Sequence, residues 1–201
     1  MLTSRFNYLI INGIGRFPEY QEGKKMTTMT RSNDTTKILV INALFIALTF
    51  VATMFINVRL PIVGNGGLIH LGNIPLFLAA FLFGKKTGAI AGGIGMAMFD
   101  LVSGWTLWAP FTLVIVAAMG WVSGLIAEKL ECNAVLKYSI AVVCACVIKI
   151  VGYYFAEVIL YHNFIVPLGS IPGNIIQVLL AGIIVIPFAP RLAAAVKKMG
   201  F

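Results

Sequence analysis

Charged residues are scarce in this chain of 201 residues, at 11% of the sequence, whereas hydrophobic residues make up 60%. A soluble globular domain carries about a quarter charged residues. The mean hydropathy is +0.96. The composition therefore excludes an ordinary soluble protein and fits one polytopic membrane domain.

Residues for metal or disulfide chemistry are also few. The sequence has three cysteines and two histidines, with neither a CxxC pair nor a histidine cluster, so we expect no disulfide framework, no metal site and no cofactor. It contains no HExxH, GxSxG or Walker sequence, and the segment 84–87 (GKKT) lacks the upstream glycine of a phosphate-binding loop. We therefore expect no catalytic residues and no ATP hydrolysis by this chain.

Apolar segments separated by glycine, proline, asparagine and charged residues predict an all-α membrane protein with six transmembrane helices. The predicted spans are 37–56, 70–83, 87–103, 109–127, 136–160 and 171–188. The second is shorter than the ~20 residues of a straight span. We expect residues 1–36 to be a cytoplasmic N-terminal tail, with Met26 or Met29 as alternative starts. Residues 37–190 would form the membrane domain and 191–201 a basic cytoplasmic tail.

The net charge of +8 reflects lysines and arginines at the ends of the apolar segments, so it does not indicate a nucleic-acid partner. The basic residues of the connections and of the C-terminal end fall on one predicted side: Lys85, Lys86, Lys129, Lys137, Arg191, Lys197 and Lys198. The opposite connections carry only Arg59 and His162. Because lysine and arginine favour the cytoplasmic side, both termini are predicted to be cytoplasmic.

Three ionisable residues, Asp100, Lys149 and Glu157, fall inside otherwise apolar segments. A charge in the bilayer core is costly, so such residues usually face a cavity or a partner. Lys149, Tyr153 and Glu157 recur every four residues and share one helix face. This spacing indicates either a stripe that lines a pocket or a ladder of salt bridges that holds the helix bundle together. Asp100 would line the same pocket or neutralise Lys149.

Further polar and aromatic groups fall in the predicted outer half of the membrane, whereas the inner halves are almost purely apolar. Asn174 and Gln177 share a face and would contact a ligand or join helices. Trp105 and Trp108 would stack on a ligand ring or anchor the interface. His70 and Asn73 begin the second span and would both line the pocket, with exposure to solvent as the alternative for His70. This asymmetry predicts an outward-facing pocket with a closed floor.

Small residues mark close contacts and a connector. Gly88-x-x-x-Gly92 predicts close helix packing, and Ala43 with Ala47 forms a small-x-x-x-small pair. The segment 61–72 contains Gly64, Gly66, Gly67 and Gly72, and is either a plain connector or a lid over the pocket.

Several of these features together resemble the substrate-binding S components of energy-coupling factor (ECF) vitamin transporters over residues 37–190. The resemblance rests on the six-span layout and on segments 70–73 (HLGN), 84–89 (GKKTGA), 91–93 (AGG), 100–104 (DLVSG) and 108–112 (WAPFT). It implies a vitamin pocket near the outer ends of the helices, gated by the glycine-rich segment, in the plasma membrane of a bacterium.

The resemblance also implies partners: a transmembrane coupling subunit (EcfT), touched by Ala43 and Ala47, and two cytoplasmic ATPases that power import. The subgroup most similar is associated with hydroxymethylpyrimidine or pyridoxine, while riboflavin and pantothenate stay open. The alternative function is an autonomous ion-coupled secondary transporter that uses Asp100, Lys149 and Glu157 as a relay. Such transporters often contain internal repeats, and the sequence shows no clear one.

Overall fold

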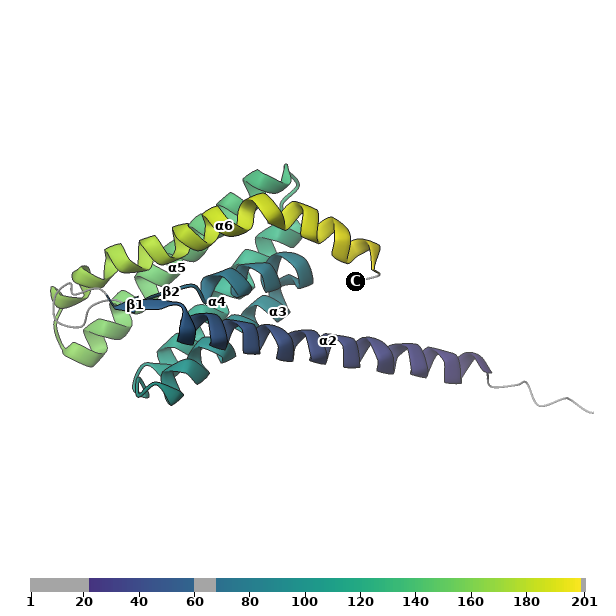
Figure 1. Cartoon of the computed structure of the whole chain (residues 1–201), viewed down its shortest axis with the longest axis horizontal. Coiled ribbons are helices and arrows are strands. Elements are labelled where there is room, and N and C mark those ends of the chain that lie inside the picture. Colours follow the sequence, from purple (N-terminus) through teal and green to yellow (C-terminus); the bar gives the residue numbers. More distant parts are fainter. Residues whose placement is uncertain (1–21, 60–67, 200–201) are drawn as a thin grey trace, which may run out of the picture. The chain divides into compact units, whose positions relative to one another are not determined.

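The computed structural model describes the backbone of residues 22–59 and 68–199, and the side chains within 34–57 and 68–199. The elements are α2 (Glu22–Phe55), β1 (Asn57–Arg59), β2 (Leu68–His70), α3 (Asn73–Val102), α4 (Ala109–Lys129), α5 (Ala134–Tyr161), the 3-10 helix η1 (Val166–Ser170) and α6 (Ile171–Lys198) (Figure 1). The chain divides into two compact units, Met1–Leu39 and Val40–Phe201. The helix packing below belongs to the second unit.

Element α3 is a pair of helices folded back on each other at Gly84. This residue has φ 87° and ψ 178°, a conformation that glycine adopts without steric cost. A Cβ on Gly88 would lie 2.6 Å from the Cβ of Ala80, and one on Gly92 would lie 2.9 Å from Leu76 Cγ. Residues eight apart in a straight helix are separated by ~12 Å, so the halves run antiparallel. The two halves of α3 correspond to the predicted spans 70–83 and 87–103.

Helix α4 packs directly on this turn. The backbone N–H of Lys85 donates to Glu128 Oε1 at 2.9 Å, and Lys85 Nζ pairs with Glu128 Oε2 at 2.5 Å. A Cβ on Gly120 would meet the carbonyl oxygen of Gly88, and one on Gly124 would meet the backbone of Lys85. The small residues of α3 and α4 therefore allow backbone-to-backbone approach, as the glycine spacing predicted.

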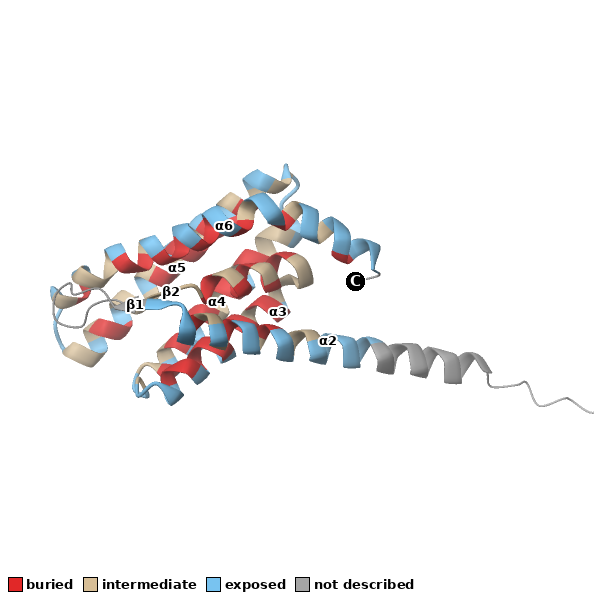
Figure 2. Ribbon diagram, viewed as in Figure 1, coloured by how far each residue is buried: buried red, intermediate tan, exposed pale blue. Residues whose placement is uncertain are grey.

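Helix α5 carries its polar side chains inward and its apolar side chains outward. Lys149 and Glu157 are 2% and 8% exposed, whereas Val147, Phe155 and Ile159 are 55–59% exposed. A soluble helix has the opposite arrangement. Figure 2 shows a similar division along α6, with buried residues on one side of the ribbon and exposed residues on the other. The arrangement fits a helix bundle surrounded by lipid.

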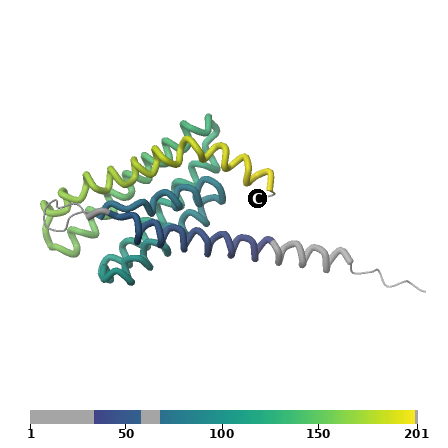
Figure 3. Tube along the Cα trace, viewed as in Figure 1, coloured from purple at the N-terminus to yellow at the C-terminus, as the bar shows by residue number. Residues whose placement is uncertain are grey.

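Five helical stretches in the described part of the chain are long and apolar enough to cross a membrane, and the folded-back α3 is counted as one of them. Consecutive helices α4, α5 and α6 lie against each other, as the trace in Figure 3 shows for α5 and α6. The core between the elements is aromatic near α5, where the Phe81 and Tyr138 rings stack with centroids 4.3 Å apart.

Two short strands were not predicted. β1 and β2 pair antiparallel, with Asn57 opposite His70, and the Leu71 N–H donates to Ile56 O at 3.1 Å. His70 therefore ends a strand instead of beginning a helix, and α3 starts at Asn73.

Helix ends also differ from the predicted boundaries. α2 begins at Glu22, so residues 22–36 are helical where a tail was predicted. α6 continues through Pro187 and Pro190 to Lys198, where the last span was predicted to end at 188. Proline is tolerated in membrane helices because neighbouring groups satisfy the freed carbonyls.

Candidate substrate-binding cavity

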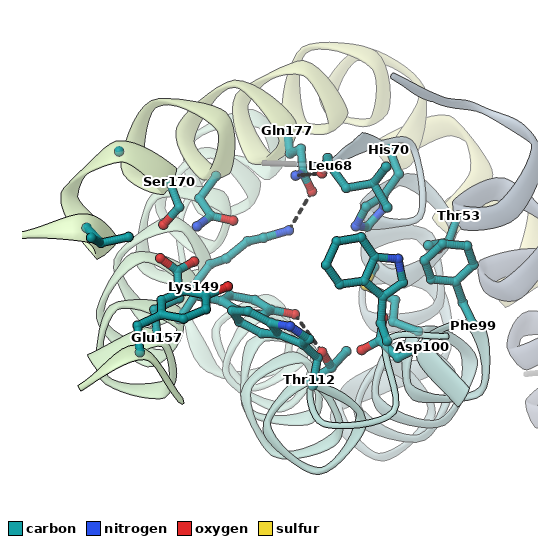
Figure 4. Close-up of a pocket in the computed structure, with 18 residues that line it drawn as sticks. Thr53, Leu68, His70, Phe99, Asp100, Thr112, Lys149, Glu157, Ser170 and Gln177 are labelled. Atoms are coloured by element: carbon teal, nitrogen blue, oxygen red, sulfur yellow. Dashed lines mark hydrogen bonds between the residues drawn. The ribbon is translucent and has the colours of Figure 1, made fainter. Parts of the chain in front are cut away.

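A cavity of about 120 Å³ lies within the second unit, between α3, α4, α5, α6 and β2. Figure 4 shows the 18 side chains that line it. All of the predicted ligand residues except Asn73 are among them: His70, Asp100, Trp105, Trp108, Lys149, Tyr153, Glu157, Asn174 and Gln177. Residues separated by more than a hundred positions in the sequence therefore converge on one space.

The α5 wall carries Lys149, Tyr153 and Glu157, which the four-residue spacing placed on one face. The Lys149 ammonium lies 5.8 Å from the Tyr153 ring centroid, and both Lys149 and Glu157 are buried. Of the described ion pairs within 4.0 Å, none joins these two residues to each other or to Asp100. The stripe lines the cavity and is not a ladder of ion pairs.

Gln177 on α6 fixes the position of Lys149. Lys149 Nζ donates to Gln177 Oε1 at 2.7 Å, and Gln177 Nε2 donates to the Leu68 carbonyl oxygen. The amide therefore joins α5, α6 and β2 through both of its polar atoms. Because the carbonyl end accepts from Lys149, the orientation of this amide follows from its partners.

Asp100 and Thr112 line the opposite wall. The Trp105 N–H donates to the Asp100 carbonyl oxygen and the Thr112 N–H to the Trp108 carbonyl oxygen, each at 2.8 Å. Tyr153 OH donates to Thr112 Oγ1 at 3.1 Å, and the Thr112 hydroxyl lies beside the Asp100 carboxyl. These bonds hold the connection between α3 and α4 so that its acidic and aromatic side chains meet the cavity.

Aromatic rings cluster where α4 begins. The Trp108 ring lies 6.3 Å from that of Tyr153 and 6.0 Å from that of Tyr161, centroid to centroid, at 36° and 60°. Trp105 also lines the cavity. Aromatic faces at these separations stabilise one another and offer flat surfaces for a ring-shaped ligand.

His70 contributes a neutral imidazole from β2. The Gly72 N–H donates to His70 Nδ1 at 3.2 Å, so the ring proton of the neutral form is on Nε2. Burial lowers the pKa of His70 well below its usual value, and the nearby Lys149 charge lowers the pKa further. His70 therefore offers the cavity a neutral N–H donor at physiological pH.

Glu157, Ser170 and Asn174 form the end of the cavity near η1. The Ser170 hydroxyl faces the Glu157 carboxyl, and donates to the Pro167 carbonyl oxygen at 2.9 Å. Asn174 is 9% exposed. Figure 4 shows Glu157 and Asp100 on opposite sides of the cavity, so the two carboxyl groups are at separate ends.

Some predicted residues lie elsewhere. Asn73 is fully buried outside the cavity, and neither of its amide atoms has a partner. Ala43 and Ala47 are exposed on α2. The glycines proposed for a gate, Gly64, Gly66 and Gly67, lie outside the described residues.

Sequence reasoning missed the other lining residues: Thr53, Leu68, Met96, Phe99, Thr112, Tyr161, Val166, Gly169 and Ser170. Most are apolar or hydroxyl residues that are common in membrane helices. Thr112 alone had a usable signal, since it follows Trp108 by one helical turn at the start of α4.

Comparison with known proteins identifies the family. The family model described as "ECF-type riboflavin transporter, S component" matches residues 33–194. The thiamine precursor transporter HmpT of Lactococcus lactis subsp. cremoris (strain MG1363) is 29% identical over 161 residues, which are 80% of this chain and 90% of that protein.

Two further proteins are similar to this chain. An uncharacterized Pyrococcus woesei protein is 43% identical over 67 residues, which are 33% of this chain and 45% of that protein. A solved structure described as the S component of a bacterial ECF transporter has the same fold, with a TM-score of 0.66 at 24% identity, over 81% of this chain and 99% of that one. The chain is a multi-pass membrane protein that belongs to the family of ECF transporter S components.

Proposed function

We propose that this chain is the substrate-binding subunit of an ATP-driven ECF importer and captures a small water-soluble vitamin precursor. The observation that carries the proposal is the cavity, in which buried carboxyl, ammonium and amide groups converge beside three aromatic rings. Ligand sites combine an apolar and aromatic lining with a few placed polar groups.

We favour a ligand with one ring, hydroxymethylpyrimidine or pyridoxine, over riboflavin. Aromatic faces and a few buried polar groups line the cavity, a combination that suits a small nitrogen heterocycle. The relative described as a thiamine precursor transporter supports the same choice, because hydroxymethylpyrimidine is such a precursor.

Import would need partners that supply ATP hydrolysis: a transmembrane coupling subunit and two cytoplasmic ATPases. Ala43 and Ala47 are exposed on α2, and small residues allow another helix to approach closely. We assign these two alanines to the contact with the coupling subunit.

The proposed topology has six spans and two cytoplasmic termini. It is supported by the reversal of α3 at Gly84 and by the basic residues at the α3 turn, the α4–α5 connection and the end of α6. A cysteine introduced at Lys86 in a chain without its natural cysteines should be labelled by a membrane-impermeant maleimide only after the cells are opened. One introduced at Asn163 should be labelled in intact cells. Labelling of both residues from the same side would contradict the topology.

Purified protein alone is expected to bind hydroxymethylpyrimidine or pyridoxine in detergent, with no ATP hydrolysis and no sustained uptake into proteoliposomes. Isothermal titration and an uptake assay measure the two properties. Adding the coupling subunit and ATPases should give ATP-dependent uptake. Concentrative uptake by the chain alone, driven by a proton or sodium gradient, would show an autonomous secondary transporter instead.

A further inference from the structure

The connection between α5 and α6 has two different surfaces. One surface contributes Val166, Gly169 and Ser170 to the wall of the cavity. The other surface carries three large apolar side chains, of Phe164, Ile165 and Leu168, which are 70%, 76% and 52% exposed. Clustered apolar side chains of this kind mark a surface that contacts another molecule or a membrane.

This connection folds back along α5 instead of extending beyond the end of the helix. Tyr154 OH donates to the Phe164 carbonyl oxygen at 3.1 Å. Tyr154 precedes the end of α5 at Tyr161 by seven residues, which is about 10 Å along the helix axis. The Ser170 hydroxyl faces the carboxyl of Glu157, one turn before the same end (Figure 4). The connection therefore lies at the level of the last two turns of α5, where that helix faces lipid.

The polar backbone groups of the connection are satisfied from within the protein. The Asn163 side-chain oxygen accepts from the backbone N–H groups of Ile165 and Val166, at 2.7 and 3.0 Å. The Leu168 N–H donates to the Ile165 carbonyl oxygen at 3.1 Å, and Pro167 has no N–H to satisfy. Irregular backbone at membrane depth needs such internal partners, because hydrocarbon supplies none.

The exposed side chains of the connection continue a surface that already faces lipid. Val151, Phe155 and Ile159 recur every four residues on α5 and are 48%, 59% and 57% exposed. The rings of Tyr154 and Phe155 meet edge to face, with centroids 5.7 Å apart. The tyrosine that holds the Phe164 backbone is therefore beside this lipid-facing stripe, and the connection extends it.

We propose that Phe164, Ile165 and Leu168 lie among the lipid acyl chains at this end of the bundle. Helix η1 then forms a thin wall of the cavity, with ligand on one side and lipid on the other. His162 and Asn163, which are polar and exposed, stay at the aqueous surface. The proposal depends neither on the identity of the ligand nor on partner subunits, so it extends the proposed function without resting on it.

The test measures the accessibility of nitroxide spin labels on the full chain in liposomes of phosphatidylcholine and phosphatidylglycerol. A chain without its natural cysteines receives one labelled cysteine, by Ile165→Cys or Leu168→Cys. Phe155→Cys gives the lipid-facing reference and His162→Cys the aqueous one. Oxygen concentrates in the bilayer, whereas a nickel chelate stays in water. The labels at 165 and 168 should be relaxed more by oxygen than by the chelate, as at 155, and the label at 162 should show the reverse.

One result would overturn the proposal. If the chelate reaches the labels at both 165 and 168 as well as it reaches the label at 162, water or a partner protein covers this surface instead of lipid. Gel filtration shows whether each labelled chain is folded, and the second position decides the question if one variant fails to fold. Such a result would leave the cavity and the binding of its ligand unaffected, because none of the labelled residues lines the cavity.

Discussion

Replacing Lys149 with methionine is expected to weaken ligand binding by about 100-fold or more. The side chain is 2% exposed, and its ammonium is the only one on the cavity wall among the described residues. The substitution leaves Gln177 Oε1 without its donor and two carboxyl groups without an opposing charge. Isothermal titration with hydroxymethylpyrimidine or pyridoxine measures the loss.

The same variant should still fold, but the ligand-free protein should have a lower thermal midpoint. Leaving the buried Gln177 Oε1 without its donor costs about 1–3 kcal/mol, which removal of the desolvated ammonium offsets only in part. Lys86→Met removes an exposed lysine and serves as the matched control. Wild-type affinity in Lys149→Met would show that this lysine serves the bundle and not the ligand.

Replacing Gly120 with alanine is expected to destabilise the protein by about 2 kcal/mol. The added Cβ would meet the carbonyl oxygen of Gly88 and lie 2.7 Å from the Ala89 nitrogen. Both are backbone atoms that move only if the α3 turn moves. The free energy lost to this clash exceeds the ~0.5–1 kcal/mol by which alanine stabilises a helix relative to glycine. A lower thermal midpoint in detergent, by roughly 4–8 °C, would report it.

Gly152→Ala is the matched control for this prediction. Its added Cβ would lie 2.8 Å from Ile115 Cγ1, an atom of a side chain that can adjust. The α5 variant should therefore lose less stability than the α4 variant. Equal midpoints in the two variants would contradict the close approach of α4 to the α3 turn.

The sequence predicted the parts of the cavity that depend on regular spacing. Lys149, Tyr153 and Glu157 recur every four residues, and a membrane helix turns such a pattern into one inward face. The α3 reversal was also predictable, because glycine and two lysines interrupt the apolar run at 84–86. Periodicity and charge therefore determined which helix faces meet.

Contacts between distant elements were not predictable. Gln177 was expected to contact a ligand or to join helices, and it bonds both Lys149 and the Leu68 carbonyl oxygen. Asp100 was expected to line the pocket or pair with Lys149, and it makes no ion pair within 4.0 Å among the described residues. A single sequence does not specify the distances between helices, so it could not distinguish the two alternative roles of Gln177 or of Asp100.

Helix ends and short strands were predicted poorly for physical reasons. The last span was predicted to end at 188, because proline and charged residues separate the apolar segments, but α6 continues through Pro187 and Pro190 to Lys198. Strands of three residues, such as β2, are too short for an alternating pattern to distinguish them from a connection. The start of α2 at Glu22 likewise falls in a polar segment without an apolar run.

The most direct test of the proposed function is to identify the small molecule that the protein carries. The purified chain is denatured, and the released compounds are identified by mass spectrometry against a mock purification. We predict a single-ring nitrogen heterocycle, hydroxymethylpyrimidine above all, at close to one molecule per chain. Release of riboflavin, or no bound small molecule and no binding on titration with these vitamins, would contradict the account.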